Sequence, residues 1–87
     1  MIVVLDRVTE RHPNLSKADV RMAWRYAAVG VPRYRGRPFE YLAVGCDGKG
    51  RILEMTGRRD VWTGDWIIWH AMTPPSVQTL REIGMRR

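Results

Sequence analysis

Alternating apolar and polar positions predict three consecutive β-strands in the second half of the chain. The segments 39–46, 51–56 and 66–72 are short and rich in β-branched and aromatic residues, and stretches rich in glycine or charge separate them. The first two are joined by Asp47-Gly48-Lys49-Gly50, a composition that tolerates the positive φ of a tight hairpin. This pattern predicts an antiparallel meander of three strands.

Helical periodicity precedes this meander. Residues 2–5 are expected to form either a short strand or the lead-in to a helix, and a short helix is predicted for residues 6–12. Ser16 is expected to cap a longer helix, because Asp19 stands at the third helical position, close to a capping box. The apolar stripe of that helix predicts an end near Gly30.

A third helix is expected after the last strand. Thr73 is placed to be its N-cap, Pro74 fits its first turn, and the apolar stripe ends at Gly84. The predicted fold is α+β: two N-terminal helices, an antiparallel sheet of three to four strands and a short C-terminal helix, with the helices on one face. Residues 1–87 are expected to form one domain, because 87 residues are too few for two cores.

Charge and cysteine content narrow the class of protein. The chain has 15 Lys and Arg against 9 Asp and Glu, a net charge of +6, which attracts nucleic acid, anionic membrane or acidic protein. All but Lys17 and Lys49 are arginines, whose planar guanidinium suits phosphate. The single Cys46 excludes an internal disulfide and a cysteine-based zinc cluster, and the apolar run at residues 1–5 is too short for a signal peptide or a membrane span. A cytoplasmic protein is predicted.

A basic connector, residues 33–38, interrupts the pattern between the helices and the meander. Its glycine and proline favour a loop or a ragged edge strand. Arg35 and Arg37, with Tyr34 beside them, could grip phosphates and stack on a base. The alternative is a solvated loop in an arginine-rich protein.

The candidate chemistry rests on Glu54 and His70. If the second and third strands pair in a suitable register, one face carries six residues: Ile52, Glu54, Thr56, Trp66, Ile68 and His70. Such a pair beside Arg51, Arg37 or Arg81 could cleave RNA without a metal, since a base activates the 2′-hydroxyl and arginines stabilise the charge on the phosphorane. The alternatives are that His70 is a partly buried sheet residue whose hydrogen bonds are made within the fold, and that Glu54 is a strand residue that faces solvent. His12 and His70 are assigned to different elements, so no metal site is predicted, and no motif calls for a cofactor.

Three tryptophans cannot all be buried in so small a protein. Strand alternation sends Trp66 and Trp69 to opposite faces, and Trp62 lies in the connection before them. One of the three is therefore expected to be exposed, for base stacking or for contact with a partner protein.

Three segments resemble the core of BrnT-like toxins, which belong to the RelE/ParE-type superfamily of small basic bacterial toxins. They are Glu40-Tyr41-Leu42-Ala43-Val44-Gly45, Gly50-Arg51-Ile52-Leu53-Glu54-Met55 and Ile67-Ile68-Trp69-His70-Ala71. The resemblance covers roughly residues 39–83, together with the position and length of the capped helix. It implies a ribonuclease, ribosome-dependent or free, or a gyrase inhibitor, in each case neutralised by a cognate antitoxin.

The resemblance also implies roles for single residues. Arg51 matches the arginine that opens the family's second strand. The family's tyrosine falls where Gly57 stands, and its closing arginine falls near Ala71, so His70 could substitute for that arginine.

The sequence therefore predicts the toxin of a type II toxin–antitoxin system that cleaves mRNA without a metal. Its partners would be RNA, on or off the ribosome, and an antitoxin, and a homodimer is left open. The predicted catalytic residues are His70, Glu54 and Arg51; the predicted RNA contacts are Arg37, Arg35, Tyr34 and Arg81. Two alternatives are a basic interaction module without catalysis and a topoisomerase inhibitor of the ParE kind.

Overall fold

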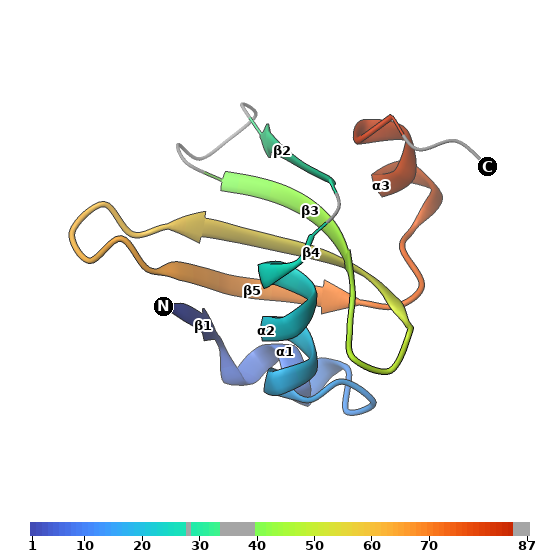
Figure 1. The fold of residues 1–87 in the computed structure, drawn as a ribbon, viewed down its shortest axis with the longest axis horizontal. Coiled ribbons are helices and arrows are strands. Elements are labelled where there is room, and N and C mark those ends of the chain that lie inside the picture. The colour runs from blue at the N-terminus through green and yellow to red at the C-terminus, as the bar shows by residue number, and fades with distance from the viewer. Residues whose placement is uncertain (28, 34–39, 85–87) are drawn as a thin grey trace.

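The computed structural model describes residues 1–27, 29–33 and 40–84. These residues form an α+β arrangement of three helices around a mixed sheet (Figure 1). The elements along the chain are β1 (Ile2–Val4), α1 (Asp6–Arg11), α2 (Lys17–Arg25), β2 (Val29–Arg33), β3 (Glu40–Cys46), β4 (Ile52–Arg59), β5 (Trp66–Met72) and α3 (Val77–Glu82). None of the helices within these ranges has the length and apolarity needed to cross a membrane.

The sheet has the strand order β1-β5-β4-β3-β2. Strands β2 to β5 are antiparallel neighbours, so the predicted meander of the last three strands is confirmed. The expectation of a purely antiparallel sheet is wrong, because β1 pairs in parallel with β5, from Ile2 opposite Trp66 to Val4 opposite Ile68. Of the two alternatives for residues 2–5, the strand is therefore the correct one for Ile2–Val4, and its partner lies near the other end of the chain.

Helix α2 begins as its sequence predicts and ends earlier. The Ser16 hydroxyl accepts a hydrogen bond from the Asp19 backbone N–H (3.0 Å), and the Asp19 carboxylate accepts one from the Ser16 N–H (2.9 Å), which completes a capping box. The helix ends at Arg25 rather than near Gly30, because residues 29–33 pair with β3. Sheet pairing there prevails over the helical periodicity.

Helix α3 begins three residues later than the sequence suggests. Its N-cap is Ser76, whose hydroxyl accepts from the Thr79 N–H at 3.2 Å, and the Thr73 hydroxyl instead donates to the Ile52 carbonyl. Pro75 explains the shift, because a residue that precedes a proline, here Pro74, is disfavoured in the helical region.

The two faces of the sheet are covered by different helices, which corrects the expectation that all helices share one face. Below the sheet in Figure 1, α1 and α2 cover the main core, formed by Val4, Val8, Leu15, Val20, Ala23, Ala43, Leu53, Met55, Ile68 and Ala71. Strand alternation places Leu42, Val44 and Thr56 on the other face, where they are also buried. Thr79 of α3 is buried as well, and the Ser76 N–H at the start of this helix reaches the Glu54 carboxylate on that face.

Helix α2 lies very close to the sheet at Gly45 of β3. A Cβ atom at this position would lie 2.1 Å from the Ala23 carbonyl oxygen and 3.0 Å from the Cα of Ala27. Both are backbone atoms of the helix or of the residues that directly follow it, so the absence of a side chain sets the distance between helix and sheet.

Candidate functional site

A β-bulge between β4 and β5 decides which way His70 points. Thr56 pairs with His70, whereas the next residue, Gly57, pairs with Ile68, so Trp69 has no partner in β4. Ile68 is fully buried in the helix-covered core, and the extra residue turns His70 to the opposite face. The expectation that Trp66, Ile68 and His70 share one face is therefore wrong.

The bulge brings His70 to Glu54. The imidazole Nε2 lies 2.8 Å from the Glu54 Oε2, and the other carboxylate oxygen accepts a hydrogen bond of 2.7 Å from the Ser76 N–H. Glu54 is buried, with 6% of its surface exposed, whereas 33% of the His70 side chain remains open to solvent. Glu54 is thus a buried partner rather than a solvent-facing strand residue, and His70 is the half of the pair that a ligand can reach.

Hydrogen bonding keeps the Glu54 carboxylate charged. Burial alone would raise its pKa, but the backbone N–H of Ser76 and the side chains of His70, Thr79 and Ser76 outweigh burial, and the pKa lies below its ordinary value of 4.5. The ionised carboxylate accepts from Nε2–H, which fixes the orientation of the ring and leaves Nδ1 as its other nitrogen. Glu54 therefore orients the His70 ring in the way that a carboxylate orients the histidine of a general acid–base pair.

His12 is a third member of this site that sequence reasoning missed. It follows directly after α1, and its ring meets the His70 ring edge-on, with centroids 6.4 Å apart and an angle of 81° between the planes. The chain reaches this position because β1 pairs with β5 and the Leu5 N–H then donates to the Ile68 carbonyl, which sets α1 beside β5. No local pattern in the sequence announces that pairing.

Arg51 lies away from the Glu54–His70 pair. Its guanidinium donates to Asp47 Oδ2 (2.8 Å), Asp19 Oδ2 (3.0 Å) and the Asn14 carbonyl (2.8 Å). The Asp47 side chain is fully buried, and Lys49 also lies 3.4 Å from Asp19. The structure thus joins Arg51 to the start of α2 and to the β3–β4 turn, and does not bring it to the pair.

The remaining predicted contacts are spread over the chain. Arg81 is exposed on α3, while Arg35, Arg37 and Tyr34 lie outside the described residues. Trp62, 93% exposed in the β4–β5 turn, confirms that one of the three tryptophans faces solvent. Within the part of the chain that the structure describes, no three His, Cys, Asp or Glu side chains gather as a metal site.

Acid is expected to destabilise this fold through its buried carboxylates. The pKa of Asp19 is lowered mainly by the hydrogen bond from the Ser16 N–H. Burial alone would raise the pKa of Asp47, but the N–H groups of Arg51 and Lys49 and the Arg51 side chain outweigh burial and lower it. The pKa of Glu54 is lowered as well. Each carboxylate binds a proton more weakly in the folded protein than in the unfolded chain. Its contribution to the free energy of unfolding is therefore complete above the unfolded pKa, 3.8 for Asp and 4.5 for Glu, and is lost as the pH falls through the lowered pKa of the folded protein.

Urea unfolding at a series of pH values measures this effect. The free energy of unfolding should be nearly constant from pH 7 to pH 5 and fall steadily below about pH 4.5. Asp47→Asn should make that fall shallower. A stability that rises on acidification would contradict the assignment.

Comparison of the chain with protein-family models, curated proteins and solved structures finds no match. The geometry of His70, Glu54 and His12 therefore carries the functional argument. A buried carboxylate, a half-exposed imidazole oriented by it and a second imidazole against the first form an arrangement suited to general acid–base chemistry.

Proposed function

We propose that this protein is a metal-independent endoribonuclease in which His70 moves the proton and Glu54 orients His70. The observation that carries the proposal is the 2.8 Å contact between the half-exposed His70 ring and the buried Glu54 carboxylate. An ionised carboxylate at this distance also offsets the positive charge that the ring gains when it takes a proton. RNA brings its own nucleophile, the 2′-hydroxyl, so an acid and a base are the main chemical needs.

The reaction needs one proton acceptor and one proton donor. His70 Nδ1 takes the proton of the 2′-hydroxyl, the oxygen attacks the adjacent phosphorus, and the bond from phosphorus to the 5′-oxygen breaks. His12, in its protonated form, gives a proton to the departing oxygen. The products are a 2′,3′-cyclic phosphate and a 5′-hydroxyl, and the 6.4 Å between the ring centroids supports a role for both rings at one phosphate group.

Phosphate binding is assigned to arginines other than Arg51. Arg81 lies on α3, the helix whose N-cap residue contacts Glu54, and the net charge of +6 attracts an RNA backbone. Arg35, Arg37 and Tyr34 stay proposed contacts of the RNA. Arg51 is already bound to Asp47 and Asp19, which supports a structural role for it.

The biological role that we propose is that of the toxin in a type II toxin–antitoxin system. Two helices before an antiparallel meander and a short helix after it agree with the RelE-like layout that the resemblance to BrnT-like toxins implies. The positive charge would suit an acidic antitoxin. The substrate would be cytoplasmic mRNA.

Cleavage of a labelled oligoribonucleotide in the presence of EDTA tests the chemistry. His70→Ala should lower the rate at least about 100-fold, the usual contribution of a general acid–base group, and Glu54→Gln should lower it as well because the ring loses its orientation. Glu10→Gln, a change at an exposed glutamate on α1, is the control that should retain full activity. A 2′-deoxy substitution at the cleavage position should abolish the product, which should end in a cyclic phosphate.

The contrary results point to the other readings. If His70→Ala arrests growth as strongly as the parent chain while cellular RNA stays intact, the ribonuclease proposal fails and topoisomerase inhibition takes its place. If neither protein arrests growth or cuts RNA, a basic interaction module is left.

A further inference from the structure

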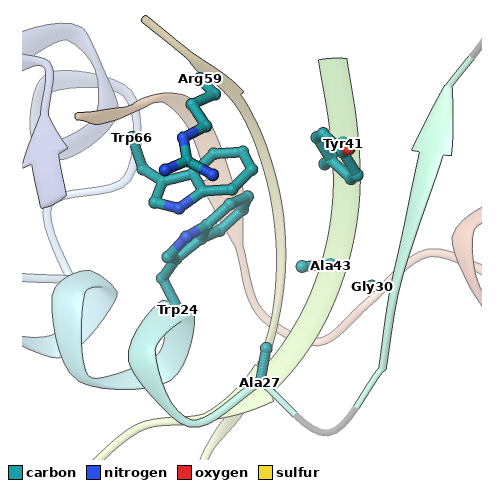
Figure 2. A pocket seen from close by; sticks show the side chains of 7 residues that line it. All are labelled: Trp24, Ala27, Gly30, Tyr41, Ala43, Arg59 and Trp66. Atoms are coloured by element: carbon teal, nitrogen blue, oxygen red, sulfur yellow. The ribbon is translucent and has the colours of Figure 1, made fainter. Parts of the chain in front are cut away.

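A second hollow lies on the helix-covered face of the sheet, away from His70. It is an open pocket of about 520 Å³, and Figure 2 shows its aromatic and small side chains converging from α2, β3, β4 and β5. Its walls are Trp24, Trp66, Tyr41 and Arg59, and the small residues Ala27 and Ala43 lie between them. Because Trp66 packs against the main core whereas His70 points to the opposite face, this pocket is separate from the proposed catalytic site.

A glycine makes room for the aromatic wall. A Cβ atom at Gly57 would lie 2.5 Å from the Ile68 side chain and 3.1 Å from the outer edge of the Trp24 ring, so the absence of a side chain at this residue lets Trp24 lie close to β4. The Trp24 and Trp66 rings then pack at 5.3 Å with a tilt of 55°, and Tyr41 meets Trp66 edge-on at 5.2 Å. The three aromatic rings thus pack against one another and form one wall of the open pocket, and the small residues complete its lining.

The polar groups of the pocket are almost all donors. The Arg59 guanidinium lies over the Trp66 ring, 5.8 Å from its centroid, and none of the lining residues carries a carboxylate. No described residue forms an ion pair with Arg59, and the indole N–H groups and the Tyr41 hydroxyl add further donors. A ligand that satisfies this set is flat, aromatic and negatively charged.

We propose that this pocket binds a nucleotide, with the base in contact with the aromatic wall of Trp24, Trp66 and Tyr41 and the phosphate held by Arg59. Stacking on an aromatic side chain suits any base, and a guanidinium matches a phosphate with paired hydrogen bonds. The net charge of +6 favours the same ligand. The nucleotide can be free or part of an RNA chain, and binding does not depend on cleavage at His70.

Titration of the full-length chain, observed through the indole N–H signals in ¹⁵N NMR spectra, tests the proposal. The probes are adenosine 5′-monophosphate, adenosine and a short oligoadenylate, each added to the parent and to His70→Ala, which prevents cleavage. The monophosphate should shift the Trp24 and Trp66 signals and leave that of Trp62 in place. Arg59→Ala should weaken monophosphate binding about tenfold, the loss of one charge-assisted contact, and leave adenosine binding within about twofold.

Arg58→Ala is the matched control, because Arg58 is the neighbouring exposed arginine of β4 and alternation turns it to the other face. It should leave monophosphate binding within about twofold, since the loss of one distant charge changes only the general field. Oligoadenylate that binds at least as tightly as the monophosphate assigns the pocket to RNA, and weaker oligoadenylate binding assigns it to a free nucleotide. Equal losses in Arg58→Ala and Arg59→Ala, or millimolar monophosphate that leaves Trp24 and Trp66 unshifted, would overturn the proposal whether or not the chain cleaves RNA.

Discussion

Arg51→Ala is expected to lower the free energy of unfolding by about 3 kcal/mol, the usual cost of removing one partner from a buried ion pair. The Asp47 side chain is fully buried, and its Oδ2 would lose the 2.8 Å bond from the Arg51 Nε. The contacts of Arg51 with Asp19 and with the Asn14 carbonyl would be lost at the same time. These contacts hold the β3–β4 turn against the start of α2, so the change should act on the whole fold.

Chemical denaturation followed by circular dichroism measures this loss. Arg58→Ala, a change at an exposed arginine of β4, should alter the stability by no more than about 0.5 kcal/mol, as surface substitutions usually do. The same pair of variants separates structure from catalysis for Arg51. An Arg51→Ala protein of unchanged stability that has lost RNA cleavage would show that the role of Arg51 is catalytic, against the structural role argued above.

Gly45→Ala is expected to cost at least about 3 kcal/mol, the upper end of what overpacking a dense core costs. The new methyl carbon would lie 2.1 Å from the Ala23 carbonyl oxygen and 3.0 Å from the Ala27 Cα. Neither obstacle is a flexible side chain, because both belong to the backbone. The helix must move away from the sheet as a body, and buried contacts of Ala23 and Val20 would loosen with it.

Gly48→Ala supplies the matched control, since a Cβ atom there meets nothing within 4 Å. Its stability should stay within about 1 kcal/mol of the parent and can rise, because alanine narrows the unfolded ensemble. Thermal unfolding of the two variants side by side measures the difference. Equal stability of Gly45→Ala and Gly48→Ala would show that α2 does not pack on β3 as closely as described.

The parts of the fold that were predicted correctly depend on neighbouring residues. Alternation located both ends of β5 without error and the ends of β3 and β4 within three residues, and Ser16 with Asp19 predicted the capping box of α2. Each signal lies within a few residues of the element that it specifies. The turn at residues 47–50 worked for the same reason, because composition fixes a hairpin over a short distance.

The errors concern partners that lie far apart in the chain. Residues 29–33 form a strand rather than the end of a helix because they pair with the edge of β3, and the choice left open for residues 2–5 is settled for 2–4 by pairing with β5; no local pattern records either partner. The bulge at Trp69 depends on how β5 pairs with β4, and it places His70 with Glu54 and Thr56 but separates it from Trp66 and Ile68, which were expected on the same face. Ala71 is fully buried in the core, whereas His70 and Glu54 lie on the other face of the sheet and contact each other at 2.8 Å.

The parallel pairing of β1 with β5 has a consequence for synthesis of the chain. The ribosome synthesises β1 and α1 long before β5, so β1 cannot pair with β5 until nearly the whole chain has been made. Contacts between residues so distant in sequence form slowly, and folding should end with the closure of this strand pair. His12 meets His70 only after that closure, so a nascent chain would carry half of the proposed acid–base pair and stay inactive until its sheet is complete.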